Sequence, residues 1–194
     1  MHNQKIKRMV SLAFLMALVL VMQMLGSIIP AIGGFSISLV LIPIVMGAVL
    51  FGPSAGALLG ATFGTIVYIN CITGADPGGA MVFQADPFLC LLVVMGKGVL
   101  AGTLSGLVFK LIGKWNVHIA MLFAAIICPV TNTGVFIVCM LTFFKDVLAA
   151  WAGGGDLIAY VLSGLVLMNF VPELILNVVF GSVGHTIIHV VKRK

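Results

Sequence analysis

Two charged side chains lie deep inside long apolar runs of the sequence, Lys97 and Glu173. A charge at the centre of a membrane helix costs about 2.5–3.5 kcal/mol on insertion scales, so such a residue is a functional hypothesis by default. Asn169, Glu173 and Asn177 follow one another at four-residue intervals, which places them on one face of a helix. Lipid does not tolerate this polar stripe, and we expect it to face the protein interior or a cavity.

A second polar group lies in another apolar run, where Asn132 stands between two threonines shortly after Pro129. Gln84 precedes the run that holds Lys97 and is placed to close over the same layer. A few convergent polar groups between apolar walls are typical of a solute-binding pocket. The alternative is a buried ion pair between Lys97 and Glu173 that joins two helices without any ligand.

Motifs for enzymatic chemistry are missing from the sequence. The two Gly-Lys pairs, at 96–97 and 113–114, lack both the upstream glycine and the following Ser or Thr of an ATP-binding P-loop. Neither HExxH nor GxSxG occurs, and the four cysteines form no CxxC pair that would suggest a metal. A lipid-modifying enzyme with Glu173 as general base is disfavoured, because this is the only acidic residue deep in an apolar run. We expect a protein that is not an enzyme and that needs no cofactor.

Composition identifies the environment of these residues. Of 194 residues, 62% are hydrophobic and 8% are charged, and the mean hydropathy is +1.29. Soluble domains carry about 25% charged residues, so this chain is predicted to be an integral membrane protein in a lipid bilayer. The net charge of +5 comes from clusters at the ends of apolar runs and does not indicate nucleic acid.

The apolar runs predict an all-α membrane protein with six transmembrane helices in one domain, residues 1–194. The expected helices cover residues 8–29, 35–51, 54–72, 87–112, 117–144 and 157–190. With six helices, eight of the ten basic residues lie on the side of both termini, and all four aspartates lie on the other side. The positive-inside rule therefore makes both termini cytoplasmic.

Small residues predict where the helices pack. Glycines recur every fourth residue at 52–64 and at 98–106, and Ala13 and Ala17 share the same spacing. Small residues four apart let helix backbones approach closely, so we expect packing inside the bundle. Trp115 and Trp151 fall in loops on opposite sides, as interfacial anchors do.

Four features then occur in a characteristic order: Ala13 with Ala17, Pro43, the turn Leu-Phe-Gly-Pro at 50–53, and the segment from Asn169 to Asn177. Together they make the chain similar to the substrate-binding S component of energy-coupling factor (ECF) transporters, the bacterial vitamin importers. The resemblance implies an S-component-like bundle in the bacterial cell membrane. Such a protein captures a vitamin near the outer face and delivers it inward with a transmembrane T component and two ATPase subunits.

The resemblance also implies roles for particular segments. Ala13 and Ala17 match the small residues that contact the coupling helices of the T component in that family. The outer loops that gate the pocket would be residues 26–35 and 73–87 here.

The polar residues suggest a substrate class. One cation, one anion and several amides, with few aromatic side chains at their depth, favour a small polar acid over a flat ring such as riboflavin or folate. Pantothenate fits, with Lys97 on its carboxylate and Asn132, Asn169 and Glu173 on its amide and hydroxyl groups. Two alternatives remain: a stand-alone channel or facilitator, and a structural subunit that binds no ligand.

Overall fold

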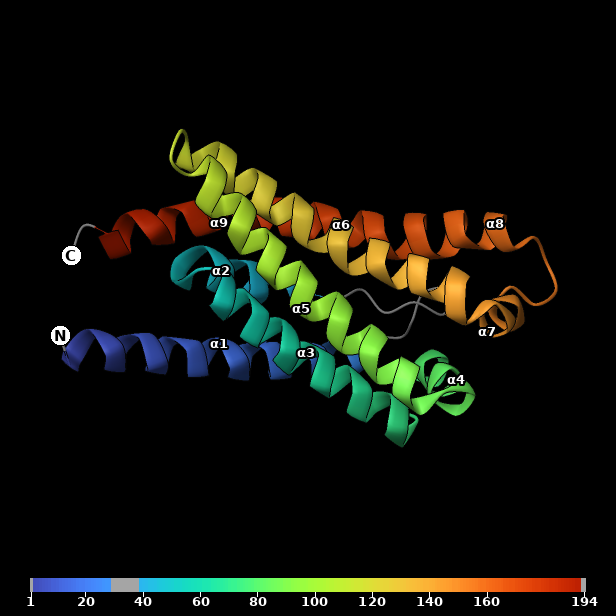
Figure 1. The fold of residues 1–194 in the computed structure, drawn as a ribbon. Coiled ribbons are helices and arrows are strands. Elements are labelled where there is room, and N and C mark those ends of the chain that lie inside the picture. Colours follow the sequence, from blue (N-terminus) through green and yellow to red (C-terminus); the bar gives the residue numbers. More distant parts are fainter. Residues whose placement is uncertain (1, 29–38, 193–194) are drawn as a thin grey trace.

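The computed structural model describes residues 2–28 and 39–192, and within these ranges it contains helices and no strand. Figure 1 shows an elongated bundle in which the start of the first helix and the end of the last helix lie at the same end of the molecule. The helices are α1 (His2–Ile28), α2 (Leu41–Phe51), α3 (Pro53–Thr73), α4 (Pro77–Ala85), α5 (Pro87–Ile112), α6 (Val117–Phe143), α7 (Lys145–Trp151), α8 (Leu157–Tyr160), the π-helix η1 (Val161–Phe170) and α9 (Val171–Lys192).

The predicted membrane helices correspond to these elements, with one correction. Five helical segments in the described chain are long and apolar enough to span a membrane, whereas the second helix is shorter than expected. It begins at Leu41 instead of residue 35, so its 11 residues extend only about 16 Å. Pro43 lies in its first turn, where backbone N–H groups have no partner within the helix. The proline therefore costs the helix no hydrogen bond.

Two stretches predicted as loops contain short helices, α4 and α7, and both lie at the end of the bundle opposite the termini (Figure 1). Asp76 begins α4 by accepting a hydrogen bond from the Gly79 N–H, and Pro77 follows it at the first helical position. Asp86 likewise begins α5 by accepting from the N–H groups of Phe88 and Leu89. An aspartate cap followed by proline is a helix-start signal that the loop prediction overlooked.

The last membrane helix changes its hydrogen-bonding pattern halfway. Its ten-residue π-helical part, η1, ends two residues before Pro172, and the N–H of Val171 bonds to the carbonyl of Val166. Pro172 has no N–H to donate to the preceding turn, so a regular α-helix would lose a hydrogen bond or kink here. The structure instead accommodates the proline with wider π-helical turns, an arrangement that often occurs at functional sites.

Helices α3 and α5 pack along their glycines. A Cβ atom on Gly60 would overlap the carbonyl oxygen of Gly98, and one on Gly56 would overlap that of Gly102. The prediction of close packing inside the bundle is thus confirmed for these glycines. Gly52 is an exception, because it ends α2 with a φ of +92° and forms the turn into α3.

Candidate functional site

Three helices bring their polar residues together in the interior. We call this group the polar cluster: Lys97 of α5, Asn132 and Thr133 of α6, and Glu173 and Asn177 of α9. Glu173 is 1% exposed, Asn177 2% and Asn132 7%. The polar stripe predicted from the four-residue spacing therefore faces the bundle interior at Glu173 and Asn177.

One hydrogen bond joins two of these helices, and a second lies within α9. The Thr133 hydroxyl donates to Oε2 of Glu173 across 3.4 Å, between α6 and α9. The Asn177 side-chain amide donates to the backbone carbonyl of Glu173, one turn earlier, across 2.9 Å. These contacts hold the Glu173 carboxylate and the Asn177 amide on the side of α9 that packs against α6.

Lys97 contacts aromatic rings. Its Nζ lies 4.7 Å from the ring centroid of Phe136 and 5.6 Å from that of Phe63. A cation this close to a ring face is attracted by about 0.5–2 kcal/mol, the larger value applying when water is excluded. Two aromatic rings, one from α3 and one from α6, therefore reach Lys97 at the depth where the sequence predicts few.

Buried amide oxygens in the same region have no hydrogen-bond partner. Within residues 2–28 and 39–192, no donor reaches Oδ1 of Asn132, Asn169 or Asn177. Asn169 lies at the end of η1, one turn before Glu173. An unsatisfied buried acceptor costs about 1–3 kcal/mol, so three of them in one region favour a ligand that supplies N–H or O–H donors.

The predicted covering residue lies outside this group. Gln84 is exposed on α4, at the end of the bundle opposite the termini, and no contact with the polar cluster is seen in the described chain. Asp86 serves as the cap of α5. Of the two predicted gating segments, residues 73–87 contain α4, and 29–35 lie outside the described residues.

One residue near the polar cluster has a different predicted role in the sequence analysis. Trp151, interpreted as an interfacial anchor, stacks on Phe136 with 6.4 Å between ring centroids and 23° between ring planes. Phe136 stands one turn after Asn132 on the same face of α6. That spacing is the one sequence signal that could have identified Phe136.

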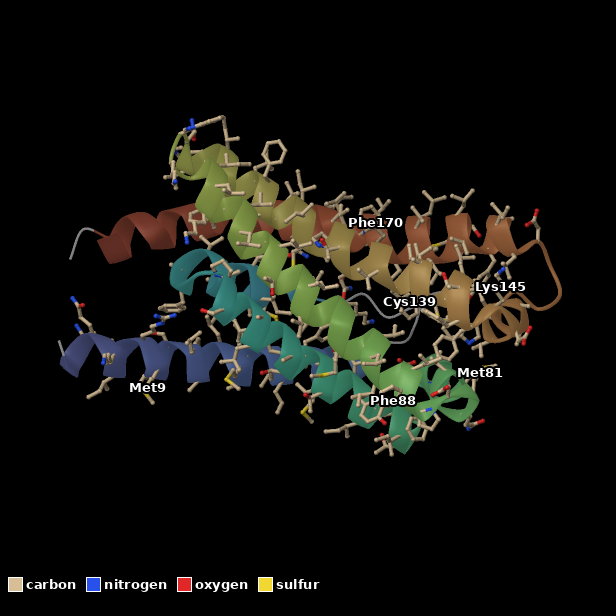
Figure 2. The ribbon with its side chains drawn as sticks, viewed as in Figure 1. Met9, Met81, Phe88, Cys139, Lys145 and Phe170 are labelled. Carbon is tan, nitrogen blue, oxygen red and sulfur yellow. The ribbon has the colours of Figure 1, made fainter. Side chains whose placement is uncertain are left out.

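Ala13 and Ala17 lie on the outside of α1, so the prediction that they pack inside the bundle is wrong. Leu15 and Val19 of α1 are buried against the bundle, whereas Ala13 and Ala17 are exposed on the opposite side of the helix. Met9 on α1 also projects away from the other helices (Figure 2). Ala13 and Ala17 thus form a shallow, small-residue strip that a partner helix can reach.

Comparison with protein families gives a match over most of the chain. Residues 7–182 match the family described as the substrate-specific component of the ECF transporter. No curated protein matches the chain. Since the match extends over far more than half of the sequence, the chain belongs to the family of substrate-specific components of ECF transporters, which are integral membrane subunits of these importers.

Proposed function

We propose that this protein captures a small, acidic, water-soluble vitamin in the polar cluster, and that pantothenate is its substrate. The observation that carries the proposal is the convergence of one half-buried cation, one buried carboxyl group and three unpartnered amide oxygens between apolar helices. Buried polar groups are retained at a cost in stability, which a bound solute offsets by supplying the missing partners.

Each polar residue has a role in this proposal. Lys97 holds the substrate carboxylate, since a charge-assisted bond is about twice as strong as a neutral one. Asn132 and Asn169 accept hydrogen bonds from the amide and hydroxyl groups of the solute. Glu173 accepts from a hydroxyl group, and its bond from Thr133 fixes the orientation of its carboxyl group.

Delivery into the cell requires partners in this proposal. The chain has no P-loop, so the energy comes from two ATPase subunits that act through a transmembrane T component. We propose that Ala13 and Ala17 contact that component, because both are exposed on the free side of α1. Close helix approach through small residues is the ordinary mode of association in lipid.

The most direct experiment is mass spectrometry of small molecules that co-purify with the protein from cells grown in rich medium. We expect pantothenate in near-stoichiometric amount and its loss in the Lys97→Ala variant. Co-purification of another vitamin in place of pantothenate would identify that vitamin as the substrate. A protein that carries no solute and binds none of the acidic vitamins would contradict the proposal and favour a structural subunit.

A stand-alone facilitator is the competing function. It needs a continuous polar path across the membrane, whereas the buried polar side chains of the described residues gather in α5, α6 and α9. Uptake of labelled pantothenate into liposomes that contain this chain alone would favour the facilitator. Uptake that appears only after the T component and ATPases are added would favour the S-component function.

A further inference from the structure

Trp151 occupies an unusual place for a loop tryptophan. It is the last residue of α7, and its indole is half-buried, stacked on Phe136 of α6. On its other side it meets α4, where a Cβ atom on Gly78 would lie 3.4 Å from Cζ2 of the indole. Figure 1 shows α4 and α7 together at the end of the bundle that the termini do not occupy.

The polar atom of this side chain has no partner. Nε1 of Trp151 is buried, and in the part of the chain that the structure describes no acceptor reaches it. A buried indole N–H normally finds an acceptor, because leaving a donor unsatisfied costs about 1–3 kcal/mol. Trp115 provides the contrast, since it is 91% exposed in the loop between α5 and α6 and needs no protein partner.

The indole is linked to the polar cluster through the ring of Phe136. The Phe136 ring that Trp151 stacks on is the ring that lies 4.7 Å from Nζ of Lys97. Lys97 and Trp151 are therefore two donor-bearing residues that contact the same aromatic ring. Both favour the same chemical class, a solute that carries an oxyanion or carbonyl oxygen beside a flat or compact apolar part.

We propose that Trp151 is a substrate-contact residue that determines specificity. Its N–H donates a hydrogen bond to an acceptor oxygen of the solute, and its ring covers the adjoining apolar part together with Phe136. The inference rests on the proposed binding function of the polar cluster and adds a residue from α7. It also brings flat, acceptor-bearing solutes such as folate into the class to be tested.

The first arm of the test measures affinity. Purified Trp115→Phe and Trp151→Phe variants are compared with the wild type for binding of radiolabelled pantothenate, folate and riboflavin. Phenylalanine keeps a six-membered ring against Phe136 and removes the N–H with the rest of the five-membered ring, so we expect about tenfold weaker binding for W151F. W115F is the matched control and should bind as the wild type does.

The second arm keeps Trp151 in place. The chain has two tryptophans, so the W115F variant reports the emission of Trp151 alone. We expect added pantothenate to change that emission in a saturable way, because the indole N–H gains a hydrogen-bond partner. This arm tests the inference even where W151F fails to fold.

The outcomes separate this inference from the proposed function. If a vitamin binds but W151F retains wild-type affinity and pantothenate leaves the Trp151 emission unchanged, the role of Trp151 is overturned while the polar cluster stands. If none of the three vitamins binds to any variant, the proposed substrate class and the role of Trp151 are both wrong.

Discussion

The interface between α3 and α5 and the polar cluster among α5, α6 and α9 share one helix but differ in their chemistry. At the first, glycines of facing helices bring the two backbones together, as Gly60 does with Gly98. At the second, amide oxygens such as that of Asn132 are buried without partners, and a π-helix replaces regular helical turns. The first region is optimised for packing, whereas the second retains unmet hydrogen-bonding capacity.

This difference assigns stability to one side of α5 and binding to the other. In a bilayer, helix association depends on close packing, because lipid supplies no hydrophobic drive between helices. Ser105, on the face of α5 that meets α6, contrasts with the amides of the polar cluster, since it is buried and its hydroxyl is satisfied by a hydrogen bond to the Ala124 carbonyl across 2.9 Å. Substitutions in the two regions should therefore have opposite effects on folding and on ligand affinity.

The largest effect is expected from Gly60→Val. Its Cβ would overlap the Gly98 carbonyl oxygen, which is backbone and cannot move aside, so α3 and α5 must separate. We expect the free energy of unfolding to fall by several kcal/mol, since overpacking costs about 1–3 kcal/mol even where side chains can adjust. Thermal unfolding and gel filtration in detergent measure it.

The matched control for this variant is Gly96→Ala on α5. A Cβ atom at Gly96 meets nothing within 4 Å, and alanine in a helix interior gains up to about 1 kcal/mol over glycine. Equal melting temperatures for the two variants would show that glycine packing is not what joins α3 to α5.

The next effect in size concerns the polar cluster. We predict that Lys97→Ala and Glu173→Gln each weaken solute binding by about 10- to 100-fold, because each removes a charge-assisted bond. Folding should persist, since glutamine still accepts the hydrogen bond from Thr133. Equilibrium binding with labelled pantothenate measures the change.

Lys110→Ala is the control for these variants, because Lys110 is an exposed cation in the last turn of the same helix as Lys97. It should leave affinity unchanged. Wild-type affinity in both cluster variants would place the binding site elsewhere.

A third prediction separates the exterior of α1 from both interior regions. Ala17→Trp, or Ala13→Trp, should reduce co-purification with the T component at least tenfold, because a large side chain blocks close helix approach. Solute binding should be unchanged, since both alanines face away from the bundle. Phe14→Trp, on another exposed part of α1, is the control, and loss of binding with intact assembly would reverse the assignment.

The membrane helices could be predicted from the sequence because long apolar runs and glycine spacing are local signals. Helix α4 was not predicted, because its glycines suggest a turn, although Asp76 and Pro77 mark a helix start. The π-helix has no comparable signal, since Pro172 predicts a disturbance without specifying which hydrogen bonds replace the regular ones.

The members of the polar cluster could be predicted individually, whereas their neighbours could not. Glu173 and Asn177 were identified because polar residues in an apolar run are conspicuous and their spacing fixes a shared face. The aromatic contacts of Lys97 depend on how α3, α5 and α6 are rotated about their axes. A helix that is apolar all round carries little information about that rotation, so Phe136 and Trp151 emerged only from the structure.

The smallest effect compares a buried polar residue without a partner for its oxygen with one whose hydrogen bond is made. Asn132→Leu replaces a buried amide whose oxygen lacks a partner with an apolar side chain of similar size. We expect the free energy of unfolding to rise by about 1 kcal/mol, because the desolvated acceptor is removed. Solute affinity should fall about tenfold.

Ser105→Ala should do the reverse. It removes the buried hydrogen bond to the Ala124 carbonyl, so we expect about 0.5–1.5 kcal/mol of destabilisation with unchanged affinity. Thermal unfolding and ligand binding measured on the same two preparations give both quantities. A destabilised Asn132→Leu variant that binds normally would mean that the Asn132 amide stabilises the fold, and the contrast between Asn132 and Ser105 would no longer hold.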